Sequence, residues 1–257
     1  MGAFLRDEAV VLRLRPFREA DAWVSCWTKH HGKHDVLATG LRKAHAKQQG
    51  HMQPFAFTEV VFVEGKEVER LTIGRMTAFH GGYIRDHQGW LQIAASVSAL
   101  CDAIAVTGEE QESTRVFELF QEIHRLAVFY RKPFSPTRSR LIEALFLDRL
   151  MQALGYGISL ERCVRCQQEG IDLSGFSLRE GGFFCSSCAS SAYGSRSLPF
   201  STPQAELAKL LTFFRAHPIE QALHVSAPQT HFLDATQVFE AMFEVLPVSR
   251  SPLSSPV

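Results

Sequence analysis

Four cysteines form two pairs with the spacing of a metal site. Two residues separate Cys163 from Cys166 and Cys185 from Cys188, and eighteen residues separate the pairs. Each pair can turn back so that two thiolates reach one ion at about 2.3 Å, and four thiolates complete the tetrahedral shell of Zn²⁺. Because no coordination position is left for water, the pattern predicts one structural zinc ion per chain.

Two disulfides, or four unrelated buried cysteines, are the alternative interpretations. Disulfide frameworks are typical of small secreted domains, and residues 1–6 have neither the basic nor the apolar region of a signal peptide. Charges also interrupt every apolar run well before a membrane-spanning length. We therefore expect a cytoplasmic protein that binds zinc. The other two cysteines, Cys26 and Cys101, lie in apolar segments and are expected to be core residues.

Enzyme motifs are missing from this chain. It has no phosphate-binding G-x-x-x-x-G-K-[ST] loop, no G-x-S-x-G nucleophile turn and no H-E-x-x-H metal helix. The 27 basic and 27 acidic residues cancel, so any surface that binds nucleic acid must be a local patch. The sequence therefore predicts a protein that is not an enzyme.

Positive charge collects between residues 29 and 47, where five lysines and arginines face one acid. A flexible basic loop can follow a phosphate backbone and bind single strands with little sequence preference, although most charged runs are simply solvated. Aromatic residues nearby are either stacking platforms for bases or core residues. They are Trp23, Trp27, Phe55 and Phe57. His30, His31 and His34 are expected on a solvated turn, where protonation would add positive charge, with a second metal site as the alternative.

A small β-barrel is expected to position this basic segment. Alternating and β-branched residues predict five short strands without crossover helices, which favours an antiparallel barrel of the oligonucleotide-binding (OB) type over an SH3-like barrel. The expected strands cover residues 10–15, 23–27, 36–39, 55–63 and 68–76.

Helical periodicity replaces the strands after residue 84. Helices are expected at residues 90–104, from about 109 to 127, at 136–154 behind a Ser135 cap, from about 203 to 214, and at 234–246. The predicted fold is α+β and multidomain, with an OB-fold barrel at residues 1–82. A helical domain at 83–160 and 195–248 carries a four-cysteine zinc-binding insertion, a zinc ribbon, at 161–194, and residues 249–257 form a disordered tail.

Three blocks, in this order, resemble the bacterial RecO recombination mediators. The first, at 32–55, contains Ala-Thr-Gly-Leu-Arg-Lys at 38–43 and Met-Gln-Pro-Phe at 52–55. The second is Leu-Gly-Tyr-Gly at 154–157, six residues before Cys163, and the third is Gly-Gly-Phe-Phe-Cys-Ser-Ser-Cys at 181–188. After residue 200 the likeness is faint, and the Ser/Pro-rich end differs from the basic tails of that family.

The resemblance implies an OB-fold, a helical domain with a zinc ribbon, and a non-enzymatic task in DNA repair and recombination. RecO-like proteins bind single- and double-stranded DNA and anneal complementary strands. With RecR, and with RecF as a further partner, they help RecA replace single-strand-binding protein at gaps, in the bacterial cytoplasm near the nucleoid. A zinc-braced protein-interaction scaffold without direct DNA binding is the alternative function.

Candidate contact residues follow from the basic segment and the resemblance together. Annealing requires that two phosphate backbones be neutralised while the base edges stay free. The expected DNA-binding residues are Lys33, Arg42, Lys43 and Lys47, with Arg13 and Arg15 on an adjacent edge. The resemblance also implies a helical-domain cleft for the acidic, Phe-ended tail of single-strand-binding protein, where arginine holds the terminal carboxylate. The candidates there are Arg138, Arg140 and Arg149.

Overall fold

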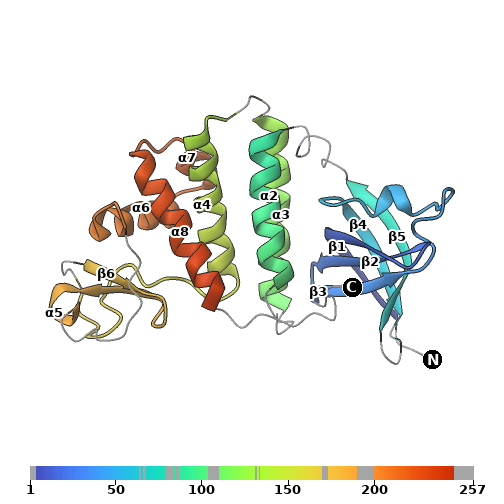
Figure 1. The fold of residues 1–257 in the computed structure, drawn as a ribbon, viewed down its shortest axis with the longest axis horizontal. Helices are drawn as coiled ribbons and strands as arrows, with labels where there is room; N and C mark the ends of the chain where they lie inside the picture. The colour runs from blue at the N-terminus through green and yellow to red at the C-terminus, as the bar shows by residue number, and fades with distance from the viewer. Residues whose placement is uncertain are drawn as a thin grey trace. The chain divides into compact units, whose positions relative to one another are not determined.

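A computed structural model gives the fold, and its elements are labelled in Figure 1. It describes residues 4–63, 65, 68–78, 84, 87–103, 110–130, 132, 134–169, 173–189 and 200–245. The contacts form two compact units, Met1–Pro133 with Pro247–Val257, and Phe134–Leu246. The contact boundary thus falls after residue 133, whereas the predicted helical domain begins at residue 83. The predicted tail at 249–257 lies outside the described residues.

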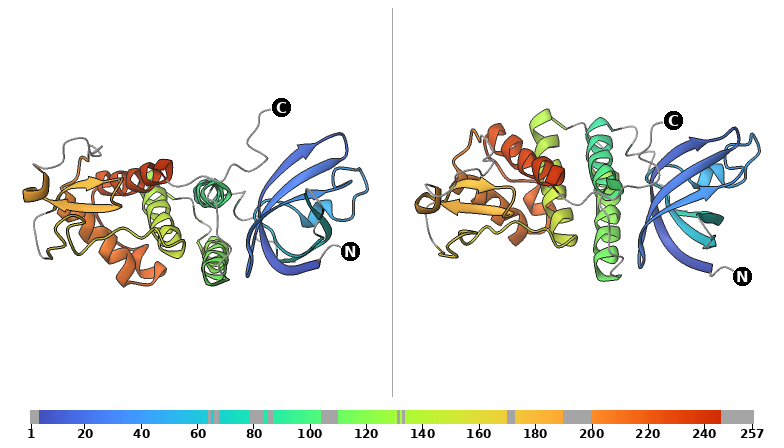
Figure 2. Two further views of the ribbon diagram at one scale, coloured as in Figure 1. Left: turned by 90° about the horizontal axis from the view of Figure 1, so that it is seen from below. Right: turned by 60° about the horizontal axis from the view of Figure 1, so that its bottom comes forward.

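The first unit begins with a five-stranded barrel. Its strands are β1 (Phe4–Phe17), β2 (Asp21–Thr28), β3 (Gly32–Ala38), β4 (Phe57–Val63) and β5 (Glu69–Ala78). The barrel closes in the order β1-β2-β3-β5-β4, with β3 and β5 parallel and the other pairs antiparallel. Figure 2 shows the blue and cyan strands curving round to close it. This architecture confirms the predicted OB-type barrel.

The β3–β4 connection, residues 39–56, is held at both ends by the barrel core. Leu41 and Met52 belong to the same buried cluster as the inward residues of the strands. Gly74 on β5 leaves room for Met52, because a Cβ there would lie 2.5 Å from the Met52 Sδ atom. The short 3-10 helix η1 (Gln49–His51) precedes Met52. The charged part of the connection therefore lies between two buried anchors.

Two helices, α2 (Gln88–Ala103) and α3 (Glu110–Phe129), pack against β1, β2 and β3 in the same unit. Trp27 is fully buried there, and its Nε1 donates a hydrogen bond to the Ser113 carbonyl at 3.0 Å. Phe57 meets the Phe117 ring edge-on at 5.2 Å between centroids. Packing of α2 and α3 on the barrel therefore buries these aromatic side chains.

The second unit contains a helical core and a small hairpin. Its helices are α4 (Pro136–Ala153), α6 (Gln204–Ala216), α7 (Ile219–Ala222) and α8 (Gln229–Val245). The hairpin consists of β6 (Leu173–Ser177) and β7 (Gly182–Cys185), and α5 (Ser186–Ala189) follows it. As predicted, Ser135 caps α4, because its side chain accepts a hydrogen bond from the Arg138 amide. Helix α8 begins five residues before the predicted 234.

Candidate metal centre and candidate nucleic-acid interface

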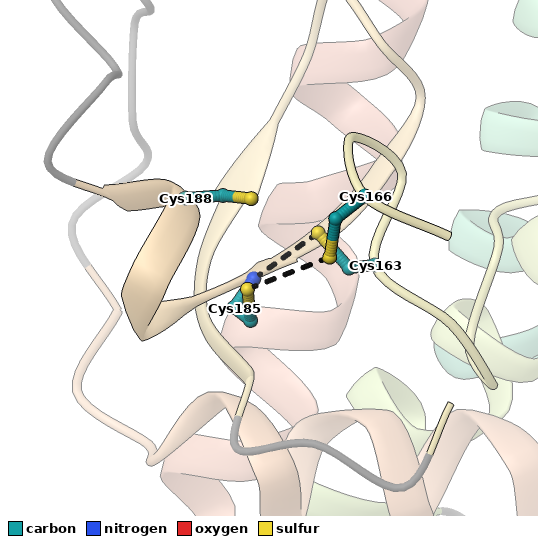
Figure 3. Close-up of side chains that lie close together, drawn as sticks. All are labelled: Cys163, Cys166, Cys185 and Cys188. Atoms are coloured by element: carbon teal, nitrogen blue, oxygen red, sulfur yellow. Dashed lines mark hydrogen bonds between the residues drawn. The ribbon is translucent and has the colours of Figure 1, made fainter. Parts of the chain in front are cut away.

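The four paired cysteines converge in the second unit (Figure 3). Their Sγ atoms all lie within 4.8 Å of one another. The Cys166 and Cys185 sulfurs are 3.9 Å apart, far beyond the roughly 2.05 Å of a disulfide bond. All six cysteines of the chain are free. The geometry therefore excludes the two-disulfide alternative and agrees with four ligands around one ion.

Backbone amides surround the most buried sulfur of this four-cysteine cluster. The amides of Arg165 and Cys185 each donate to Cys163 Sγ at 3.4 Å. Burial raises the pKa of the Cys163 thiol, but the backbone donors outweigh burial and lower the pKa to about 6. Hydrogen bonding to Cys185 and then burial raise the pKa of Cys188 to about 12. A divalent cation would stabilise all four sulfurs as thiolates, so this donor set fits a structural metal.

Arg165, which is not among the predicted site residues, stabilises the cluster. Its Nε donates to Glu180 Oε2 at 2.9 Å, and its Nη1 donates to the Cys188 carbonyl at 2.9 Å. The guanidinium also lies over the Phe184 ring, 4.7 Å from the centroid. One side chain thus joins both cysteine pairs. Its position inside the first C-x-x-C pair is the sequence signal that could have identified it.

Three of the predicted DNA-binding cations are exposed on the β3–β4 connection. They are Arg42, Lys43 and Lys47, and none forms an ion pair with a described acid. Among the described residues, the Arg42 guanidinium donates only to main-chain carbonyls, those of Arg18 at 3.2 Å and Glu19 at 3.4 Å. Gly40, at a φ of +71°, turns the chain into this segment. These three residues form the basic loop, whose cations remain available to an external anion.

Lys33 and Arg13 are instead engaged by acids. The Lys33 ammonium lies 3.1 Å from Asp102 Oδ1 and 3.4 Å from Asp35 Oδ2, and its side chain is only 8% exposed. Arg13 Nη2 lies 2.5 Å from the other Asp102 oxygen. Asp102 lies in the last turn of helix α2, so the packed helix supplies the acid that the sequence did not place here. Both cations are therefore paired with acids of the same unit and are less available to phosphate than the exposed cations of the connection.

Arg15 and the four nearby aromatics divide between surface and core. Arg15 is half-buried and lies opposite Trp23 on β2. Trp23 is half-buried too, whereas the other three aromatics, Trp27, Phe55 and Phe57, are 0%, 6% and 6% exposed. Trp23 meets Phe17 edge-on at 5.9 Å, and Arg18 covers Phe17 at 5.0 Å. Trp23 alone remains a stacking candidate among the four.

The histidine cluster is tied to two separate carboxylates. His30 Nδ1 and His31 Nδ1 each lie 2.8 Å from an oxygen of buried Asp7, and His34 Nδ1 lies 2.8 Å from Glu69. Burial raises the pKa of Asp7, but hydrogen bonds, chiefly from His31 and His30, outweigh it and lower the pKa below its usual value. Within the described chain, only the four-cysteine cluster groups three or more metal-ligating side chains. His30 and His31 therefore form a turn bound to Asp7, and His34 lies on β3 beside Glu69.

The arginines predicted to hold a partner's carboxylate are largely occupied. Arg149 Nη2 donates to the carbonyls of Phe214 and His217, both at 2.7 Å, and so closes the end of α6. Arg140 Nη1 lies 2.9 Å from Glu143. The Arg138 side chain has no bonded partner among the described residues. Two cavities, of about 520 and 440 Å³, are lined by other residues.

Family models match most of the chain. The model described as "Recombination protein O N terminal" matches residues 1–79, and "Recombination protein O C terminal" matches residues 91–246. The first match covers the barrel strands and the second covers α4, the cysteine cluster and α8. Among the described residues, no helix combines the length and apolar character needed to cross a membrane.

Curated relatives agree with these matches, and each is named DNA repair protein RecO. The protein of Syntrophomonas wolfei subsp. wolfei is 29% identical over 199 residues, 77% of this chain and 76% of the relative. That of Desulforamulus reducens is 28% identical over 223 residues, covering 86% and 82%. That of Frankia casuarinae is 30% identical over 185 residues, covering 71% and 72%.

Proposed function

Because this chain belongs to the RecO family, whose members act in DNA repair and recombination, we propose that it is a mediator that binds DNA strands without modifying them. It binds single- and double-stranded DNA, anneals complementary strands and, with RecR, helps to load RecA onto gaps coated with single-strand-binding protein. RecF is a further proposed partner, and the cytoplasmic, nucleoid-associated location is part of the same proposal. That the protein is not an enzyme remains a prediction.

The observation that carries this proposal is the basic loop, Arg42, Lys43 and Lys47. Its cations are exposed and are not neutralised by described acids, while Leu41 and Met52 anchor its ends in the core. Such cations replace the counterions of a phosphate backbone, which makes binding favourable and salt-dependent. Contacts to phosphate leave the base edges free, as annealing requires.

The four-cysteine cluster supports this role indirectly. We propose that it holds Zn²⁺, since four sulfurs without an open position suit a structural site. The ion would fix the β6–β7 hairpin, whose short strands have little core of their own. For the tail of single-strand-binding protein, Arg138 is the remaining candidate of the three, because Arg140 and Arg149 are bound within the helical unit.

Annealing of complementary oligonucleotides in the presence of single-strand-binding protein tests the function. The parent protein should accelerate annealing, and the triple variant R42E/K43E/K47E should not, because each reversal adds repulsion from phosphate. A matched control reverses three exposed cations of the second unit, R162E/R179E/K209E. An absence of DNA binding by the parent would favour the scaffold function instead.

A further inference from the structure

Strands β1, β4 and β5 are neighbours in the barrel (Figure 1), and large side chains are exposed on their outer side. The strand register sets Phe4 opposite Val63 on β4, and Val63 opposite Arg70 on β5. Two residues along, Val61 is flanked by Arg6 and Ile73, and the next row contains Glu8, Glu59 and Arg75. We define the outer β4 face by six of these residues, Phe4, Arg6, Glu59, Arg70, Ile73 and Arg75.

This face exposes large apolar side chains. Phe4 is 67% exposed and Ile73 is 49% exposed. An exposed phenylalanine offers an aromatic ring, and nucleobases stack on such rings in proteins that bind single strands. The central strand of this face, β4, is paired on both sides, with β1 and with β5, so it offers no free edge for a partner's β-strand. The side chains of this face, and not its backbone, must therefore make any contact.

Its charge is positive once the ion pairs of its acids are taken into account. Glu8 lies next to Glu59 in the strand register, and its Oε2 is 3.7 Å from the Lys29 ammonium. Glu59 accepts hydrogen bonds from Arg6 Nε, at 2.7 Å, and from Arg6 Nη2. Arg70 and Arg75 are exposed, and neither forms an ion pair with an acid in the described part of the chain. Two guanidiniums thus flank Ile73 along β5, and guanidiniums without a paired acid suit the phosphates of a nucleic-acid strand.

The outer β4 face is continuous with the basic loop. Gln48 follows Lys47 directly, and its Nε2 donates to the Thr72 carbonyl on β5 at 3.0 Å. Thr72 lies between Arg70 and Arg75 in the same strand. The barrel therefore carries two adjoining cationic surfaces, one on the connection and one on the sheet.

We propose that the outer β4 face is a second binding surface for single-stranded nucleic acid. Phe4 and Ile73 contact bases there, and Arg70 and Arg75 contact phosphates. This inference rests on the proposed DNA binding and deepens it, because annealing requires that two strands be held at once. The basic loop holds one strand, and the outer β4 face receives the second.

Charge reversal on β5 tests the electrostatic part. The variant R70E/R75E should bind a single oligonucleotide within about threefold of the parent, because the basic loop still holds one strand, yet anneal about tenfold more slowly. The control R162E/R179E/K209E should change neither property. If R70E/R75E anneals at the parent rate while R42E/K43E/K47E does not, the second surface is overturned and the proposed function stands.

Substitution at Phe4 tests stacking. F4L keeps an apolar side chain but removes the ring, so it should slow annealing severalfold. F4W keeps an aromatic ring and should anneal at the parent rate. The fluorescence of the tryptophan added in F4W should also report binding. When a second oligo(dT) molecule saturates the protein, the fluorescence of F4W should decrease more than that of the parent. Equal annealing by F4L and the parent, with no quenching in F4W, would overturn the proposal. Normal annealing by F4L together with loss of its binding to RecR would also overturn the proposal, and would indicate that this face binds a protein.

Discussion

The basic loop and the helical unit use the same residue types in opposite ways. In the loop, the Arg42 guanidinium donates hydrogen bonds to two main-chain carbonyls and pairs with no described acid, and Lys43 and Lys47 are exposed. In the helical unit, Arg215 binds Asp148 at 2.8 Å, and Arg149 closes the end of α6. A cation is available to a partner only where folding leaves its charge without an acid and its side chain in solvent. Composition and spacing alone do not reveal which cations these are.

Breaking the metal site should have the largest effect on the helical unit. C163S removes a buried sulfur that two backbone amides contact, and Zn²⁺ contributes about 10–16 kcal/mol in zinc-finger peptides. We expect zinc to fall from about one ion per chain to nearly none by elemental analysis, with the hairpin becoming protease-sensitive. S186A, an exposed neighbour, is the control. Full zinc content in C163S would contradict the assignment of four cysteine ligands.

Removing Arg215 should cost the next largest amount. R215A leaves the Asp148 carboxylate, whose side chain is 0% exposed, without its charged partner, at a cost of about 3–5 kcal/mol. Burial raises the pKa of Asp148 despite Arg215, so the cost should shrink as the pH falls and the carboxyl becomes neutral. Urea unfolding at two pH values measures both effects. K209A, on the exposed side of α6, should change stability by less than about 0.5 kcal/mol.

Asp7 allows a smaller test in the barrel unit. Because its pKa is lowered in the folded state, it contributes stability above the usual carboxyl pKa, and this is lost as the pH falls through the folded value. D7N should therefore lower stability by about 1–3 kcal/mol at pH 7 and flatten the decline below about pH 4. Urea midpoints across this range measure the change. If the stability of D7N decreased as steeply as that of the parent when the pH falls, Asp7 would be excluded as the source of the decrease.

The basic loop should contribute almost nothing to stability. R42E/K43E/K47E should unfold within about 0.5 kcal/mol of the parent, since its cations meet no described acid. R215A and this triple variant, compared in one urea series, measure the contrast between the two regions directly. A loss above about 2 kcal/mol in the triple variant would mean that these cations hold the fold together.

The sequence predicted local features well, because they depend on near neighbours. Five strands, the Ser135 cap and the four-cysteine cluster follow from alternation, capping chemistry and spacing. For the region of β6 and β7, the sequence predicts a zinc ribbon but not the bounds of its strands. Its strands are short, and Gly175 serves to admit the Phe184 ring, since a Cβ there would lie 2.2 Å from it.

Long-range pairing explains what the sequence did not predict. Lys33 meets Asp102 across 69 positions, and Arg149 meets Phe214 across 65, so neither partner could be read from local pattern. Trp27 and Phe57 resemble stacking aromatics in the sequence, yet packing by α3 buries both. Strand register, which places Phe4 and Ile73 on one exposed face, likewise requires the closed barrel.

The salt dependence of single-stranded DNA binding tests the central claim most directly. The slope of log K against log salt concentration should become shallower by about 2 in R42E/K43E/K47E, since each lost phosphate contact removes about 0.7. The slope of R162E/R179E/K209E should match the parent. Equal slopes and affinities for the parent and the basic-loop variant would contradict the assignment of DNA binding to this loop.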